Sequence, residues 1–157
     1  FIRTEADELQ YNLHVMLRFD LEKSLISGDL IVNEIEDAWN ARFESDFGYE
    51  VKKPSQGVLQ DVHWAAGAFG YFPTYTLGNV YAGCLYEKMR DSVPNLDASL
   101  MNGDPSGATK WLGENIQMHG SLFEPKATIE KAINNRITVT PLLNYLKDKY
   151  SDLYGLH

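Results

Sequence analysis

The chain has 157 residues, which is long enough for one compact domain with a sizeable core. Its 14 basic and 22 acidic residues give a formal net charge of -8. This balance argues against nucleic acid or an anionic membrane as the main partner, because both are bound through clustered Lys and Arg. Cys84 is the only cysteine, so the sequence excludes an internal disulfide and a thiolate metal cluster and favours a reducing compartment.

The first two predicted elements form a helical hairpin. Apolar residues recur at three- and four-residue steps and predict the buried face of a helix over residues 5–26: Ala6, Leu9, Leu13, Met16, Leu17 and Leu21. Gly28 is predicted to stop this helix. Asp29 is predicted to cap a second helix from Leu30 to about Phe47, and Gly48 to end it.

The later helices share a start that contains proline, whose missing amide hydrogen is not needed in a first turn. These starts are Pro73, Asp104-Pro105, Glu124-Pro125 and Thr140-Pro141. The first of these helices is expected to run to about Ser92, and the second to stop at Gly120. Residues 136–139 are rich in β-branched side chains, so a short β-pair is the one exception expected. The predicted fold is an all-α array in a single domain over residues 1–157.

The histidines do not form a zinc-peptidase motif within the chain. His14, His63, His119 and His157 are far apart, and none has the partner four residues away that a His-Glu-x-x-His helix requires. The residues alone therefore predict no metal site. His14 and His157 are expected to be solvent or core histidines.

Residues 60–75, QDVHWAAGAFGYFPTY, combine polar side chains with two glycines outside any amphipathic repeat. Gly67 and Gly70 permit backbone conformations that bring a loop close to a ligand. His63 can donate a hydrogen bond from one ring nitrogen while a neighbour such as Asp61 holds the other. This segment is therefore the candidate site.

Two tyrosines of the segment are further hydrogen-bond donors. Tyr71 and Tyr75 share one helix face if the helix has begun by Tyr71, whereas only Tyr75 is held in this way if it begins at Pro73. Together with His63 they suit the stabilisation of an oxyanion or the binding of a peptide backbone. The alternative is that His63 and Trp64 pack in a tight turn, with the tyrosines at its rim.

Two multi-residue motifs give the chain a resemblance to a known family. Residues 2–7, IRTEAD, match Ile/Val-Arg-x-x-Ala-Asp, and residues 57–64, GVLQDVHW, match Gly-x-x-Gln-Asp-x-His-Trp. With these motifs the sequence resembles the C-terminal part of the carboxypeptidase Taq family of zinc metallocarboxypeptidases. Three further segments are similar to that family: residues 69–79, 119–125 and 144–150. Residues 134–139 depart from it, because they lack the glycine turn expected before the last helix.

The resemblance implies a helical array that forms one wall of a substrate cleft, in an enzyme that hydrolyses single residues from peptide C-termini. Members of this family bind one zinc ion or another divalent metal ion. The ligands are the two histidines of a His-Glu-x-x-His helix and a downstream glutamate, and all of them precede the matched region. The chain is thus expected to be a C-terminal fragment, to lack the metal ligands and to be inactive alone. Its start at Phe1 rather than at methionine agrees with this expectation.

The resemblance also implies roles for individual residues. His63 is expected to face the substrate and Tyr75 to stabilise the oxyanion, with Tyr71 as a second phenol at the cleft wall. Arg3 is expected to pair with the terminal carboxylate of the substrate, since a guanidinium holds a carboxylate in two hydrogen bonds. The alternative for Arg3 is a salt bridge to Asp7 on the same helix face.

Gln60 and Asp61 are expected to lie at the substrate site, where their main role is to orient His63. The expected partners are a peptide with a free C-terminus and, when the protein is intact, a second copy in a cytoplasmic homodimer. No membrane partner is expected, since no apolar run approaches the roughly 20 residues of a membrane-spanning helix. The rival interpretations are a non-catalytic helical module that binds a peptide or a partner helix, and a purely structural piece. A His-Glu-x-x-His segment upstream would favour the enzyme.

Overall fold

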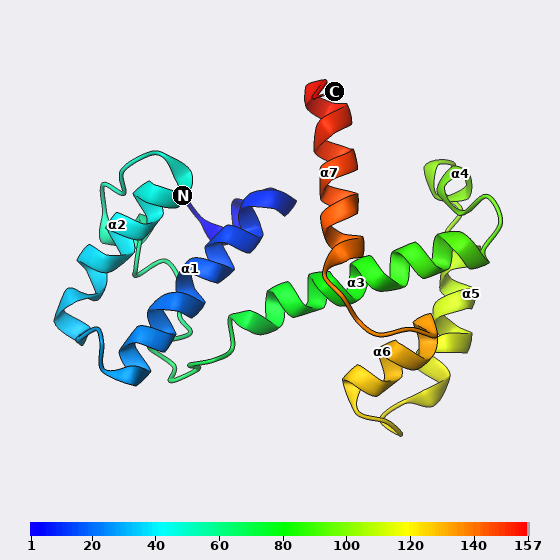
Figure 1. Cartoon of the computed structure of the whole chain (residues 1–157), viewed down its shortest axis with the longest axis horizontal. Helices are drawn as coiled ribbons and strands as arrows, with labels where there is room; N and C mark the ends of the chain where they lie inside the picture. Colours follow the sequence, from blue (N-terminus) through cyan, green and yellow to red (C-terminus); the bar gives the residue numbers. More distant parts are fainter. Residues whose placement is uncertain (157) are drawn as a thin grey trace. The chain divides into compact units, whose positions relative to one another are not determined.

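The computed structural model describes residues 1–156. Within that range the chain folds into seven α-helices and short 3-10 turns without any strand, which confirms the predicted all-α class (Figure 1). Contacts within the chain divide it into two compact units, Phe1–Leu77 and Gly78–His157. No helix of the described residues has the length and apolarity that crossing a membrane requires.

The first unit begins with a 3-10 turn at Arg3–Glu5 and continues into helix α1, Glu8–Ser27. The helix starts later than predicted, because Asp7 has an extended backbone and acts as its cap. The Asp7 carboxylate accepts hydrogen bonds from the amides of Leu9, at 3.0 Å, and Gln10, at 2.8 Å. This cap satisfies two of the amides that a helix start leaves without a partner.

Helix α2, Ile35–Phe47, lies beside α1 as the predicted hairpin (Figure 1). The prediction that Asp29 caps a helix from Leu30 is wrong. Asp29 instead accepts a hydrogen bond from the Ser27 hydroxyl at 2.6 Å, and a 3-10 turn at Val32–Glu34 precedes the α-helix. The α-helix therefore begins at Ile35 rather than at Leu30.

The core of the first unit lies between the two helices. Leu17, Leu21, Trp39 and Phe43 form its buried cluster, and Val51, Val58 and Trp64 from the following loop pack against it. Full burial of each such side chain contributes about 1.5–3 kcal/mol. Gly57 fits here because a Cβ would lie 2.9 Å from Val51 Cγ1. The loop is thus held against the core immediately before the candidate site.

The face of α1 that is buried differs in part from the predicted one. Leu17 and Leu21 are buried as expected, whereas Leu9 and Met16 are 47% and 49% exposed. The buried face instead includes charged or polar residues spaced four apart: His14, Arg18 and Glu22. Burial of charge is costly unless the charge is paired, so this face predicts polar partners elsewhere in the unit.

The second unit contains most of helix α3 (Pro73–Ser92). It also contains helices α5 (Ser106–Asn115), α6 (Pro125–Ile133) and α7 (Thr140–Tyr154). Its buried cluster consists of Met89, Leu96, Trp111 and Ala132. A short helix, α4, Leu96–Met101, was not predicted, because six residues are too few to form an apolar repeat.

Two predictions for the second unit need correction. The helix expected to stop at Gly120 ends at Asn115, and a 3-10 turn at Gln117–His119 follows it. The β-pair expected at residues 136–139 is absent, and these residues connect α6 to α7. A β-branched run forms a strand only beside a partner strand, and none exists within residues 1–156. His157, which was expected to be a solvent or core histidine, lies outside the described residues.

Candidate functional site

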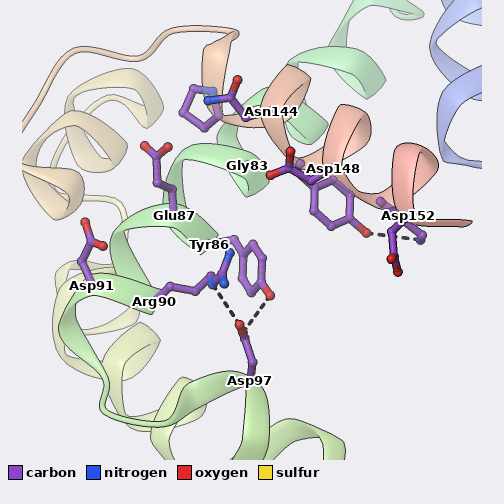
Figure 2. Close-up of a pocket in the computed structure, with 12 residues that line it drawn as sticks. Gly83, Tyr86, Glu87, Arg90, Asp91, Asp97, Asn144, Asp148 and Asp152 are labelled. Carbon is purple, nitrogen blue, oxygen red and sulfur yellow. Dashed lines mark hydrogen bonds and ion pairs between the residues drawn. The ribbon is translucent and has the colours of Figure 1, made fainter. Parts of the chain in front are cut away.

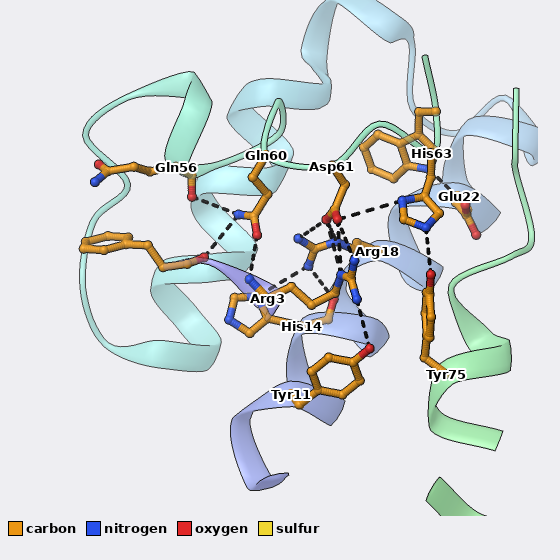
Figure 3. Close-up of polar contacts among 12 residues, drawn as sticks. Arg3, Tyr11, His14, Arg18, Glu22, Gln56, Gln60, Asp61, His63 and Tyr75 are labelled. Carbon is orange, nitrogen blue, oxygen red and sulfur yellow. Dashed lines mark hydrogen bonds and ion pairs between the residues drawn. The ribbon is translucent and has the colours of Figure 1, made fainter. Parts of the chain in front are cut away.

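The fold gathers all six predicted site residues in the first unit. Figure 3 shows five of them: Arg3, Gln60, Asp61, His63 and Tyr75. Arg3 comes from the N-terminal 3-10 turn, and Tyr75 lies in the first turn of α3. The others come from the loop before α3: Gln60, Asp61, His63 and Tyr71. Gly67 and Gly70 in this loop have φ of 73° and 79°, so the backbone uses the freedom that glycine provides at both positions.

His63 and Tyr75 form the centre of the site. The His63 Nε2 atom lies 3.0 Å from the Tyr75 hydroxyl, within hydrogen-bonding distance. The buried ring of Phe72 packs on the imidazole, with centroids 4.3 Å apart. The His63 side chain keeps 15% of its surface exposed. The pair is therefore oriented on one side by packing without being sealed from solvent.

Tyr71 lies beside this pair but outside the helix, because α3 begins at Pro73. Its ring contacts the Tyr75 ring edge to face, with centroids 5.4 Å apart, and 50% of Tyr71 is exposed. Tyr75 is thus the phenol held by the helix, and Tyr71 is a phenol at the open edge.

Asp61 sits between two arginines. Its Oδ1 lies 2.7 Å from Arg3 Nη2, and its Oδ2 accepts a hydrogen bond from Arg18 Nε at 2.7 Å. Arg3 is 5% exposed, and Arg18 is fully buried with its guanidinium 4.5 Å from the Trp39 ring centroid. Two cations share one anion, so these three groups carry a net charge of about +1.

The pKa values follow from this arrangement. Burial alone would raise the pKa of Asp61, but its hydrogen bonds and ion pairs with Arg3 and Arg18 hold that pKa below the usual value. Burial lowers the pKa of Arg18 to about 10 although Asp61 opposes the change. Burial also opposes the charge of Arg3, but its bonds to Asp61 and Tyr11 raise the Arg3 pKa overall. All three groups are ionised at neutral pH.

Asp61 also faces the candidate histidine. Its Oδ1 is 3.8 Å from His63 Nδ1, too far for a hydrogen bond, and Nδ1 is buried without a hydrogen-bond partner. The imidazole orientation depends instead on Phe72 and on the anchors at each end of its loop.

Two side chains of α1 provide those anchors. Arg18 binds Asp61, and Glu22 Oε1 accepts a hydrogen bond from Trp64 Nε1 at 2.9 Å. His63 lies between Asp61 and Trp64 in the chain, so α1 holds the loop on both sides of it (Figure 3). Sequence reasoning missed Arg18 and Glu22. The signal was their spacing of four residues from each other and from His14 on one helix face.

Gln60 ties the N-terminal turn to the same loop. Its Oε1 accepts a hydrogen bond from the Arg3 amide at 2.8 Å, and its Nε2 donates to the carbonyls of Phe1 and Gln56. The alternative expected for Arg3, a salt bridge to Asp7, is wrong. Asp7 caps α1, and the Arg3 guanidinium binds Asp61 and donates to the Tyr11 hydroxyl at 2.9 Å.

His14 makes the stability of this unit pH-dependent. Burial and the charge of Arg18 lower the pKa of His14 from 6.5 to about 4. Between these values the unfolded chain binds a proton that the folded chain does not, so the free energy of unfolding falls as pH drops from about 6.5 to about 4. At roughly 1.4 kcal/mol per pKa unit, the full loss is about 3 kcal/mol.

Urea denaturation followed by circular dichroism at about pH 7 and about pH 4.5 would measure this loss. His14→Gln, which cannot take up a proton, is expected to flatten the pH dependence over this window. An equal loss of stability in the wild type and in His14→Gln would contradict the assignment.

The described residues do not contain a metal site. No group of three His, Cys, Asp or Glu side chains within residues 1–156 is arranged to hold an ion. Cys84 is buried, and its Sγ contacts the Thr138 carbonyl oxygen at 3.2 Å. The donor set of this part of the chain therefore does not fit a bound metal.

A groove of about 850 Å³ lies between α3 and α7 in the second unit (Figure 2). Its acidic lining residues outnumber its basic ones: Glu87, Asp91, Asp97, Asp148 and Asp152 against Arg90 and Lys149. Asp97 accepts a hydrogen bond from the Tyr86 hydroxyl at 2.8 Å and pairs with Arg90 Nε at 2.9 Å. None of the predicted site residues lines this groove, so it is not the candidate site.

Comparison with known proteins identifies the class to which this fold and site belong. The profile of the carboxypeptidase Taq (M32) metallopeptidase family matches residues 1–150. Carboxypeptidase 1 of Bacillus subtilis is 41% identical over 156 residues, and thermostable carboxypeptidase 1 of Thermus thermophilus is 40% identical over 154. These alignments cover 99% and 98% of this chain but 31% and 30% of the relatives.

Solved structures agree with the sequence relatives. The M32 carboxypeptidase from Deinococcus radiodurans R1 matches with a TM-score of 0.94 and 42% identity, over 99% of this chain and 31% of that one. Trypanosoma cruzi metallocarboxypeptidase 1 matches with a TM-score of 0.89 and 35% identity, over 95% and 32%. The chain belongs to the carboxypeptidase Taq (M32) metallopeptidase family, as its two motifs predicted, and spans about a third of the length of these relatives.

Proposed function

We propose that this chain is the C-terminal part of a metal-dependent carboxypeptidase that removes single residues from the C-termini of peptides. Membership of the family and the contact between His63 and Tyr75 support this proposal. The contact carries it, because an imidazole and a phenol that meet at a partly open site are suited to the charge that develops during peptide hydrolysis.

Tyr75 is the proposed oxyanion donor. Hydrolysis of a peptide passes through a tetrahedral intermediate whose oxygen is negatively charged, and a preorganised O–H donor stabilises that charge. The Tyr75 hydroxyl is available for this purpose when His63 Nε2 carries a proton and donates to the phenol oxygen, because the phenol hydrogen then remains free. His63 is proposed to set this orientation and to face the substrate, with Tyr71 at the same edge.

Arg3 is proposed to attract the terminal carboxylate of the substrate. Its guanidinium belongs to the cluster in which two cations share Asp61, and the net positive charge of that cluster favours an anion nearby. The same guanidinium lies 4.9 Å from the centroid of the Tyr75 ring, so the anion-attracting charge adjoins the proposed oxyanion donor. Gln60 and Asp61 are proposed to support this site by holding Arg3 and the His63 loop.

The intact enzyme is proposed to use one divalent metal ion, with zinc as the proposed metal. Residues outside this chain are proposed to hold it. Membership of a metallopeptidase family supports the metal, and the described residues of this chain are not proposed as its ligands. A cytoplasmic location and a homodimer are further proposals, and both rest on the family resemblance.

An assay on peptide pairs tests this function. The intact protein is expected to shorten a peptide with a free C-terminus one residue at a time and to cleave the C-terminally amidated peptide much more slowly, with products identified by mass spectrometry. Arg3→Ala is expected to reduce the ratio of the two kcat/KM values by about tenfold, because the net positive charge that attracts the terminal carboxylate is lost. Both kcat/KM values scale with the concentration of folded enzyme, so their ratio does not depend on the fraction of the variant that is folded.

Arg42→Ala is the matched control for this assay. Arg42 pairs with Asp20 and Asp46 across α1 and α2, and its side chain is 35% exposed. The ratio is expected to stay at the wild-type value in this variant. Equal losses on free and amidated peptides in Arg3→Ala would assign Arg3 a purely structural role, and equally fast cleavage of free and amidated peptides by the wild type would remove the carboxypeptidase activity.

A further inference from the structure

Helix α1 exposes an apolar stripe opposite its buried face. Leu9, Met16, Phe19 and Ile26 are 47%, 49%, 39% and 75% exposed. At 100° per residue these four positions fall within an arc of about 100°, on the side away from Leu17 and Leu21. We call these four residues the outer stripe. Large apolar side chains exposed opposite a buried face are typical of a helix that another part of a larger structure covers.

A small pocket continues the outer stripe. It has a volume of about 330 Å³ and is lined by Phe19, Glu22, Lys23, Ile26, Ser27, Phe69 and Gly70. Its surface is almost entirely apolar. Phe69 stacks on Trp64 with ring centroids 6.1 Å apart, so the pocket adjoins the residue that follows His63.

One residue that lines this pocket, Glu22, carries a buried carboxylate. The residue is 3% exposed, and its Oε1 accepts the hydrogen bond from Trp64. Its second oxygen, Oε2, is buried without a hydrogen-bond partner. An unsatisfied buried carboxylate oxygen costs free energy.

We propose that the outer stripe and its pocket are covered by the part of the intact peptidase that this chain lacks. Relatives have about two thirds of their length without a counterpart here, which provides the covering segment. That segment would place an apolar side chain in the pocket. It would thereby hold Trp64 and the His63 loop in place from the side opposite the core. This inference shares with the proposed function only the premise that the chain belongs to a longer protein.

Thiol labelling in the intact protein tests this proposal. Ile26→Cys places a thiol on the outer stripe, and Glu44→Cys places one on the exposed face of α2. Glu44 is a suitable control because a carboxylate position is expected to remain in water. A maleimide probe is expected to modify the thiol of Ile26→Cys at least about 100-fold more slowly than that of Glu44→Cys in native protein, and equally fast in urea. Mass spectrometry identifies the labelled peptides, and circular dichroism verifies that both variants fold.

Each outcome decides the proposal separately from the peptidase activity. Slow labelling of Ile26→Cys that is independent of protein concentration supports it, whether or not the protein cleaves peptides. Labelling of Ile26→Cys at a rate within about threefold of Glu44→Cys in an active enzyme overturns it while the proposed function stands. Protection that appears only at high protein concentration also overturns it, because a second copy then covers the stripe.

Discussion

Tyr75→Phe in the intact protein is expected to reduce kcat for peptide hydrolysis by about two to three powers of ten while leaving KM nearly unchanged. The substitution removes only the hydroxyl that lies 3.0 Å from His63 Nε2. The ring itself remains and keeps its contacts with Arg3 and Tyr71. An interaction made chiefly in the transition state is therefore lost without a change in the folded structure. Steady-state kinetics on a peptide with a free C-terminus measures the effect.

Tyr49→Phe is the matched control for the loss of a phenol hydroxyl. The Tyr49 ring packs edge to face on Phe43, with centroids 5.3 Å apart, in the same unit. The kcat of the Tyr49→Phe enzyme is expected to remain within about twofold of the wild-type kcat. A Tyr75→Phe enzyme with wild-type kcat would remove Tyr75 from the mechanism and leave the His63 contact as a structural hydrogen bond.

Asp61→Asn is expected to lower the free energy of unfolding by about 3–5 kcal/mol. The substitution keeps the shape of the side chain but removes the charge that Arg3 and Arg18 share. Arg18 is fully buried and Arg3 is 5% exposed, so neither guanidinium can replace Asp61 with water. Two buried cations would then lie close together without a counter-charge, which is among the most costly single changes in a protein interior.

Urea denaturation at about pH 7 measures this loss. Because the pKa of Asp61 is held below its usual value, its stabilising contribution is fully present at that pH and disappears only in acid, as pH falls through the lowered pKa. Asp46→Asn is the control, since it breaks an ion pair with the partly exposed Arg42. That change is expected to cost at most about 1 kcal/mol. Similar losses in the two variants would contradict the buried cluster.

Local signals in the sequence predicted the helices where the cause lies within a few residues. Gly28 and Gly48 end α1 and α2 as predicted, and both adopt a left-handed backbone. The cap predicted at Asp104 is displaced by one residue, because α5 begins at Ser106 with Pro105 at its cap position, although Asp104 accepts a hydrogen bond from the Ser106 amide. The failures at the start of α2 and at α4 share a cause, because short elements are decided by single contacts rather than by a repeating pattern.

The candidate site was predictable as a list of residues but not as an arrangement. The motif of residues 57–64 located Asp61 and His63, and the proline at position 73 placed Tyr75 in a first helical turn. Apolar periodicity could not indicate that Arg18 and Glu22 are buried, because it assigns charged residues to the surface. Their partners lie 43 and 42 residues further along the chain.

The sequence by itself determined the all-α class, the family and the segment that carries the candidate chemistry, because periodicity, proline starts and contiguous motifs act over short stretches of chain. Only the tertiary structure decided which face of α1 turns inward and which charges meet. Leu17 and Leu21 pack on Trp39 and Phe43, which turns this face of α1 inward and buries Arg18 with it. The loop closes over the core and brings Asp61 against Arg3 and Arg18, so these charges are buried together rather than unpaired.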